Sequence, residues 1–168
     1  MTERTMPLRP ENLLHLGLIA ASFAVVYLHT VIRLVGDWSV DSNFSHGFLI
    51  PPIAAYMLWQ RRKELTDARQ EPSRWGLAVL AAGMALHIVG NVGAELFTMR
   101  FSILVTLLGL TLYLFGWEVT RKALIPILYL LLMIPIPAIL WNKIAFPMQL
   151  FACSLAADVM RLLSIHIL

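Results

Sequence analysis

Long apolar segments, separated by short polar ones, make up most of this 168-residue chain. A helix that crosses a bilayer needs about 20 mostly apolar residues. The pattern therefore predicts about five membrane-spanning helices, over residues 13–35, 44–59, 75–97, 101–117 and 123–141. The first segment is longer than the apolar core of a cleaved signal peptide, so we expect it to be retained. The predicted fold class is an all-α, polytopic transmembrane helical bundle.

Prolines and polar residues make three segments irregular. The segment 44–59 is short and contains Pro51 and Pro52, which predicts a tilted, broken or re-entrant helix. The segment 123–141 contains three prolines that should bend it, Pro126, Pro135 and Pro137. The last segment, residues 144–168, fits either an interfacial amphipathic helix or a sixth, polar-lined span.

Basic residues are concentrated on one side of these predicted helices. Nine of the 13 Lys and Arg residues lie in three regions that a five-helix topology puts on the same side. They are Arg4, Arg9, Arg61, Arg62, Lys63, Arg69, Arg74, Arg121 and Lys122. By the positive-inside rule this side is cytoplasmic, so the N-terminus is expected in the cytoplasm and residues 36–46 outside.

The composition supports a membrane protein and excludes several other classes. Hydrophobic residues make up 59% of the chain and charged residues 14%, with a mean hydropathy of +0.75. A soluble domain is about a quarter charged, so a disordered chain, a nucleic-acid-binding domain and an ordinary cytosolic enzyme are excluded. One cysteine excludes a disulfide framework and a Cys-rich metal site. We expect a single membrane domain over residues 1–168, with the lipid bilayer as a partner, no nucleic acid and no cofactor.

Polar residues near the outer ends of the helices are the candidates for chemistry. They are predicted to form an outer-face cluster of Asp41, Asn43, Ser45, His46, Glu95 and Arg100. Asn43 or Ser45 could cap the helix that follows, or the segment could have a functional role centred on the His46 imidazole. Ser45 beside His46 is not a catalytic pair, because a triad requires residues that converge in space.

A second polar pattern lies on the third predicted helix. His87, Asn91 and Glu95 are four residues apart, so a continuous helix would place them on one face, with Arg100 close to Glu95. Such a stripe serves either interhelical hydrogen bonding or a functional path, because ionisable groups in a membrane face the bundle interior or water. No metal site is expected, since the spacing is not that of a His-Glu-x-x-His motif.

Two stretches of the chain carry recognisable motifs. The first contains Ser45-His46-Gly47 and Pro51-Pro52 and continues into Leu58-Trp59 and Gln60-Arg61-Arg62. The second comprises Met133-Ile134-Pro135-Ile136-Pro137, Phe146-Pro147-Met148-Gln149-Leu150 and residues 156–163. Both stretches resemble the exosortase/archaeosortase family. The resemblance covers residues 37–168 and implies a multi-pass cysteine peptidase or transpeptidase of a bacterial or archaeal cytoplasmic membrane. It also implies a substrate class, exported proteins with a C-terminal sorting signal made of a short motif, a membrane span and a basic tail.

The resemblance does not extend to the family's catalytic residues. The family nucleophile lies in an Ala-Cys-Ser-Gly element, and later spans carry an Arg and a further His or Arg. Here Ala152-Cys153-Ser154 is followed by Leu155. On a helix, the residues three or four positions from Cys153 are not basic: Gln149, Leu150, Ala156 and Ala157.

These departures give two expectations about activity. We expect that Cys153 is not the nucleophile, and that the chain is a partial exosortase-like domain without peptidase activity of its own. The alternative is a non-enzymatic polytopic membrane protein, such as an assembly partner or a small transporter subunit, for which the polar stripe would suit a proton or substrate path.

Overall fold

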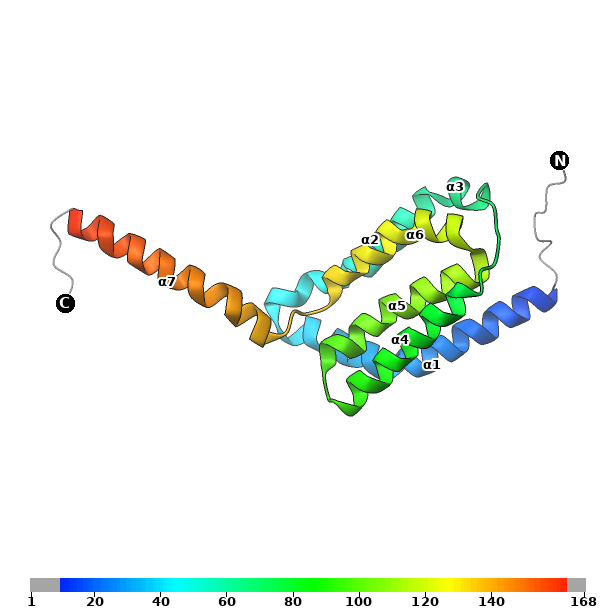
Figure 1. Cartoon of the computed structure of the whole chain (residues 1–168), viewed down its shortest axis with the longest axis horizontal. Coiled ribbons are helices and arrows are strands. Elements are labelled where there is room, and N and C mark those ends of the chain that lie inside the picture. Colours follow the sequence, from blue (N-terminus) through cyan, green and yellow to red (C-terminus); the bar gives the residue numbers. More distant parts are fainter. Residues whose placement is uncertain (1–9, 163–168) are drawn as a thin grey trace. The chain divides into compact units, whose positions relative to one another are not determined.

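The computed structural model describes residues 10–162, and the chain divides into two units, Met1–Ile134 and Pro135–Leu168. Every element between residues 10 and 162 is helical, so the predicted all-α class is confirmed (Figure 1). The first unit contains α1 (Pro10–Val40), the 3-10 helix η1 (Ser42–Phe48), α2 (Ile50–Gln60), α3 (Arg62–Thr66), α4 (Trp75–Val92), α5 (Leu96–Phe115), α6 (Trp117–Tyr129) and the 3-10 helix η2 (Leu130–Met133). The second unit contains α7 (Ala138–Leu162).

Helices α4 and α5 form the most closely packed pair of the first unit (Figure 1). Glycines on α4 permit this approach, since a Cβ added to Gly83 would lie only 2.9 Å from the Thr106 backbone nitrogen. The same relation recurs every seven residues along the pair: Gly76 faces Tyr113, Gly83 faces Thr106 and Gly90 faces Met99. Small residues at such an interface let two membrane helices make close van der Waals contact.

Helix α5 is the central helix of the first unit. In its membrane-spanning part 44% of the residues are buried, compared with 17% in α1 and in α4. It packs against α1, α4 and α6, and Ile103 and Leu104 join Tyr27 and Leu34 of α1 in the core. The helix ends at Gly116, whose φ of 83° allows the sharp turn into α6.

Two of the predicted spans are short or broken helices. Helix α2 has 11 residues and α6 has 13, which at 1.5 Å per residue is about 16 and 20 Å, less than the roughly 30 Å hydrocarbon core. The irregular second segment is confirmed, because η1 and α2 are separate helices joined at Leu49. A fifth helix continuing to residue 141 is wrong, because η2 ends at Met133 and Ile134 is extended. Pro135 and Pro137 lack the N–H groups that would continue the helix.

Four helices are long and apolar enough to cross a membrane, namely Gly17–Val40, Trp75–Val92, Leu96–Phe115 and Trp141–Leu162. Two predicted boundaries are wrong, since α4 ends at Val92 rather than near residue 97, and α5 begins at Leu96 rather than at residue 101. The turn between them passes through Ala94, which has a positive φ of 51° and so cannot belong to a continuous right-handed helix.

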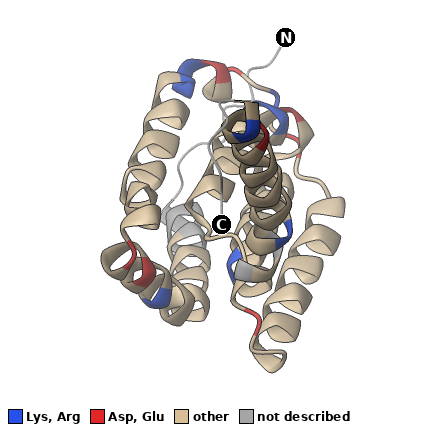
Figure 2. Ribbon diagram, turned by 90° about the vertical axis from the view of Figure 1, so that its left-hand side faces the viewer, with Lys and Arg blue, Asp and Glu red and all other residues tan. Residues whose placement is uncertain are grey.

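The loop 60–74 and the start of α6 lie together at one end of the first unit, which we call the basic end (Figure 2). Arg61 Nη1 donates to the Lys122 carbonyl oxygen at 3.3 Å. Lys122 Nζ donates to the Glu64 carbonyl oxygen at 3.0 Å. The Arg69 backbone N–H donates to Glu118 Oε2 at 3.0 Å. The prediction that these two basic regions share one side is confirmed. Arg4 and Arg9 lie outside the described residues.

The described part of the second unit consists of the non-helical residues 135–137 and one long helix, α7. Helix α7 has 25 residues, contains Pro147 and has no buried residue in its Trp141–Leu162 segment. It begins at Ala138, before residue 144, where the last segment was predicted to start. Its 25 residues exceed the roughly 20 that a membrane span needs, as the prediction of a sixth span requires.

Candidate functional site

Four segments of the first unit meet at the end opposite the basic end, which we call the His46 end. They are the last turns of α1, the 3-10 helix η1, the start of α5 and the end of η2. Trp38 of α1 donates its Nε1–H to the Met133 carbonyl oxygen at 2.9 Å, and Asp37 of α1 forms an ion pair with Arg100 of α5. The polar candidates from the sequence lie on these segments and on the turn before α5.

The helix η1 is organised by its own polar side chains. Asp41 is the N-cap, and its Oδ1 accepts hydrogen bonds at 2.9 Å from both the backbone N–H and the side-chain Nδ2 of Asn43. Ser45 Oγ donates to the Ser42 carbonyl oxygen at 2.8 Å. Capping of the following helix by Asn43 or Ser45 is therefore wrong. Its N-cap is Leu49, which makes no side-chain hydrogen bond there.

The glycine of the Ser-His-Gly sequence is required by packing. Gly47 is buried against the Trp38 indole, and a Cβ added there would lie 2.5 Å from Trp38 Cδ1. Phe48 packs its ring edge-to-face with the same indole, at 5.2 Å between centroids. Because Gly47 faces inward, the adjacent His46 side chain is exposed on the last turn of η1.

Arg100 pairs with a residue that the sequence did not bring forward as a candidate. Its Nη2 lies 2.5 Å from Asp37 Oδ2, and its side chain is only 3% exposed, compared with 44% for Asp37. The ion-pair partner of Arg100 is therefore Asp37 and not Glu95, the residue that the sequence placed near it. A buried arginine on a membrane helix requires an acidic or carbonyl acceptor, and that requirement was the signal that could have identified Asp37.

Glu95 is the N-cap of α5, so the predicted stripe with His87 and Asn91 is wrong. Its carboxylate accepts hydrogen bonds from the backbone N–H groups of Phe97 at 3.2 Å and Thr98 at 2.5 Å. The hydrogen bond from Thr98 holds the pKa of the Glu95 carboxyl below its ordinary value. Glu95 is thus an exposed, ionised cap of the central helix.

His87 belongs to a polar cluster inside the bundle. Its Nδ1 lies 3.4 Å from Ser102 Oγ, and Ser102 Oγ donates to Tyr27 Oη at 3.2 Å. Tyr27 Oη lies 2.7 Å from Thr106 Oγ1, so the cluster connects α1, α4 and α5. This geometry supports interhelical hydrogen bonding, the first of the two roles considered for His87. Sequence reasoning missed Tyr27, Ser102 and Thr106, because hydroxyl groups in apolar helices gave no distinct pattern.

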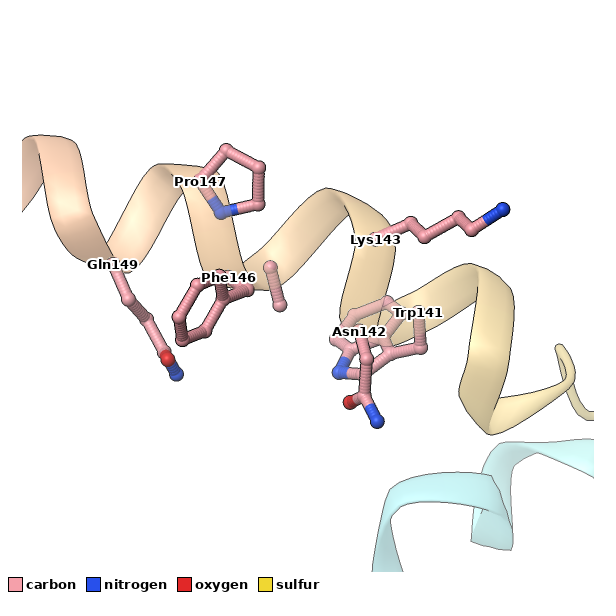
Figure 3. A pocket seen from close by; sticks show the side chains of 7 residues that line it. Trp141, Asn142, Lys143, Phe146, Pro147 and Gln149 are labelled. Atoms are coloured by element: carbon pink, nitrogen blue, oxygen red, sulfur yellow. The ribbon is translucent and has the colours of Figure 1, made fainter.

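Helix α7 carries the one cysteine of the chain, and Cys153 is exposed. A shallow hollow on the same helix is lined by residues of its early turns alone: Trp141, Asn142, Lys143, Ala145, Phe146, Pro147 and Gln149. Figure 3 shows the labelled side chains projecting from one helix. The hollow brings no residues of different elements together, so it does not form a catalytic constellation. Within residues 10–162, no three His, Cys, Asp or Glu residues are placed to hold a metal ion.

Residues 38–168 match the family model described as transmembrane exosortase (Exosortase_EpsH). No curated protein matches the chain, and no solved structure matches it. The match begins at Trp38, the residue against which Gly47 is packed.

Proposed function

Because this chain belongs to the transmembrane exosortase family, we propose that it forms the membrane scaffold of a peptidase or transpeptidase that processes C-terminal sorting signals of exported proteins. The single observation that carries the proposal is the family match over residues 38–168. We also propose a multi-pass location in a bacterial or archaeal cytoplasmic membrane, with a cytoplasmic N-terminus.

The proposed place of action is the His46 end. His46 is exposed there, while the residues next to it are fixed by Gly47 against Trp38 and by the Asp41 cap. A fixed backbone with an exposed imidazole suits a group that contacts a substrate, since positioning limits the conformational freedom lost on binding. In this proposal the end faces the extracytoplasmic side, where an exported substrate would arrive.

The proposed chemistry needs a thiolate nucleophile with cationic partners that keep it ionised and stabilise the oxyanion. Cys153 remains predicted not to be that nucleophile, because the residues one helical turn away, such as Gln149 and Ala157, carry no positive charge. We therefore assign residues 10–162 to substrate guidance and scaffolding, and no bond-breaking step to any of them.

The alternative of a non-enzymatic membrane protein has one observation in its favour. The cluster of Tyr27, His87, Ser102 and Thr106 places a titratable group and three hydroxyls inside the membrane bundle. Such groups also line proton or substrate paths in transport proteins. The two proposals differ in the residue that matters most, which is His46 for the exosortase and His87 for a transport path.

Replacement of His46 in an exosortase that contains this chain and its nucleophile segment tests the proposal. His46→Ala should lower release of the processed substrate about tenfold or more, with unchanged accumulation in the membrane. Ser42→Ala is the matched control, because Ser42 is also exposed on η1 and should leave processing unchanged. Normal processing by His46→Ala would contradict the proposed role of His46, and lower processing by His87→Ala in the same assay would point to the polar cluster inside the bundle instead.

A further inference from the structure

Exposed tryptophans and arginines occur in pairs around the basic end. Trp59, Trp75 and Trp117 are 58%, 78% and 69% exposed. Each has an arginine close to it in the chain, which gives three pairs: Trp59 with Arg62, Trp75 with Arg74, and Trp117 with Arg121. The Arg62 guanidinium carbon lies 4.3 Å from the centroid of the Trp59 ring, a cation–π contact. The three pairs come from three different parts of the chain.

The cations of this end exceed the carboxylates available to them. Two cations are paired, Arg69 with Glu71 at 2.6 Å and Lys122 with Glu118 at 3.1 Å. Within the described part of the chain, five more lie in no ion pair: Arg61, Arg62, Lys63, Arg74 and Arg121. The carboxylates left over in the same region are those of Glu64 and Asp67. The basic end therefore presents excess positive charge.

The tryptophans identify the partner of this charge. A basic surface alone would suit nucleic acid, an acidic protein or a lipid headgroup. An exposed indole at the end of a membrane helix sits at the headgroup level, with its ring against the acyl chains and its N–H in the polar layer. An arginine beside it can bind two phosphate oxygens with its planar fork. The combination matches the phosphodiester of a membrane lipid.

We propose that the basic end binds the phosphate groups of anionic phospholipid headgroups through its three Trp–Arg pairs, Trp59–Arg62, Trp75–Arg74 and Trp117–Arg121. Each pair would hold a headgroup at a different point on the rim of the bundle. The site would anchor this end in an anionic leaflet. This inference is independent of the proposed peptidase function, because it uses none of the residues at the His46 end.

Lipid retention by the purified 168-residue chain tests the proposal. The chain in detergent is incubated with equal amounts of phosphatidylglycerol and phosphatidylcholine, and the lipids that remain after size exclusion are quantified by mass spectrometry. We expect phosphatidylglycerol to be enriched about fivefold or more, and the enrichment to disappear in the triple variant Arg62→Gln, Arg74→Gln, Arg121→Gln.

A matched control removes the same number of exposed cations from other regions, in the triple variant Arg33→Gln, Lys143→Gln, Arg161→Gln. It should keep the enrichment. Equal loss in both triple variants would show a net-charge effect and overturn the proposal, as would full enrichment in the first one. Displacement of phosphatidylglycerol by inorganic phosphate would show a site for free anions and overturn the assignment to lipid.

The single variants keep the test decisive if the first triple variant does not fold. Arg62→Gln, Arg74→Gln and Arg121→Gln should each lower the enrichment in part, and less than the triple variant does, since each removes one of three headgroup contacts. Three single variants that all retain the enrichment of the original chain would contradict the proposal.

Discussion

The two ends of the first unit use the same kinds of charged residue in different ways. At the His46 end, Arg100 is 3% exposed and its partner Asp37 is 44% exposed, so the cation of this ion pair is buried and the carboxylate is partly exposed. At the basic end, the Arg69–Glu71 pair is on the surface, with side chains 78% and 63% exposed. A surface pair contributes about 0–1 kcal/mol, whereas removing one partner of a buried pair costs about 3–5 kcal/mol.

This difference indicates different tolerances to change. The His46 end depends on defined contacts, because Asp37, Trp38 and Gly47 each touch a particular partner in another element. At the basic end the ion pairs are exposed or partly exposed, so water screens them and each contributes little to folding stability. Substitutions should therefore lower the folding stability strongly at the His46 end and weakly at the basic end.

The largest effect is expected from Asp37→Ala. It leaves the buried Arg100 guanidinium without its carboxylate. Arg100 Nε also has no hydrogen-bond partner in the described part of the chain. The chain should lose about 3 kcal/mol of stability, seen as a lower thermal unfolding midpoint in detergent by circular dichroism.

The control for this prediction is the double variant Asp37→Ala, Arg100→Leu, which removes both charges. It should be more stable than Asp37→Ala alone, because an apolar side chain then occupies the buried position. A double variant that is less stable than the single one would show that Arg100 has another partner, and the ion pair would not be what holds α1 to α5.

The next largest effect is expected from Gly47→Ala. The new methyl group would overlap the Trp38 indole, so the indole or η1 must move, at a cost of about 2 kcal/mol. Gly36→Ala is the matched control, because a Cβ at that position meets nothing within 4 Å. Unfolding midpoints measured on the two variants should differ clearly. Equal midpoints would mean that Trp38 does not fix the Ser-His-Gly segment.

A smaller effect is expected from Glu95→Ala, which removes the cap of α5 and should cost about 1 kcal/mol at neutral pH. Hydrogen bonding from Thr98 lowers the pKa of Glu95 in the folded state, so its contribution is present above the unfolded pKa. It is lost as the pH falls through the lower, folded pKa. The difference between the original chain and the variant should therefore shrink in unfolding curves recorded at increasingly acidic pH, and a constant difference would contradict the capping role.

The smallest effect is expected from Glu118→Gln at the basic end. The hydrogen bond from Lys122 lowers the pKa of Glu118, so its contribution also disappears as the pH falls. Glu118 is exposed, and water replaces its partners readily, so its loss should be smaller than that of Glu95→Ala in the same experiment. A larger loss would mean that the basic end also depends on defined contacts.

Local sequence patterns predicted the fold class and the grouping of the basic loops, and contacts between distant residues account for most of what they missed. Apolar length predicted the helices, since each needs only its own residues. The Asp37–Arg100 pair and the contact of Trp38 with Met133 join residues far apart in the chain, which no local pattern encodes. The error at Glu95 arose because a spacing of four was taken as one helix, although Gly93 and Ala94 form a turn and Glu95 is the extended N-cap of the next helix.

The central claim, that the His46 end is extracytoplasmic and the basic end cytoplasmic, is tested most directly by cysteine labelling in whole cells. Ser42→Cys in η1 and Thr66→Cys in α3 are made separately in a Cys153→Ala background, since both positions are exposed and lie at opposite ends of the first unit. A membrane-impermeant thiol reagent should label Ser42→Cys in intact cells and Thr66→Cys only after lysis. Labelling of Thr66→Cys in intact cells, with Ser42→Cys protected until lysis, would contradict the account.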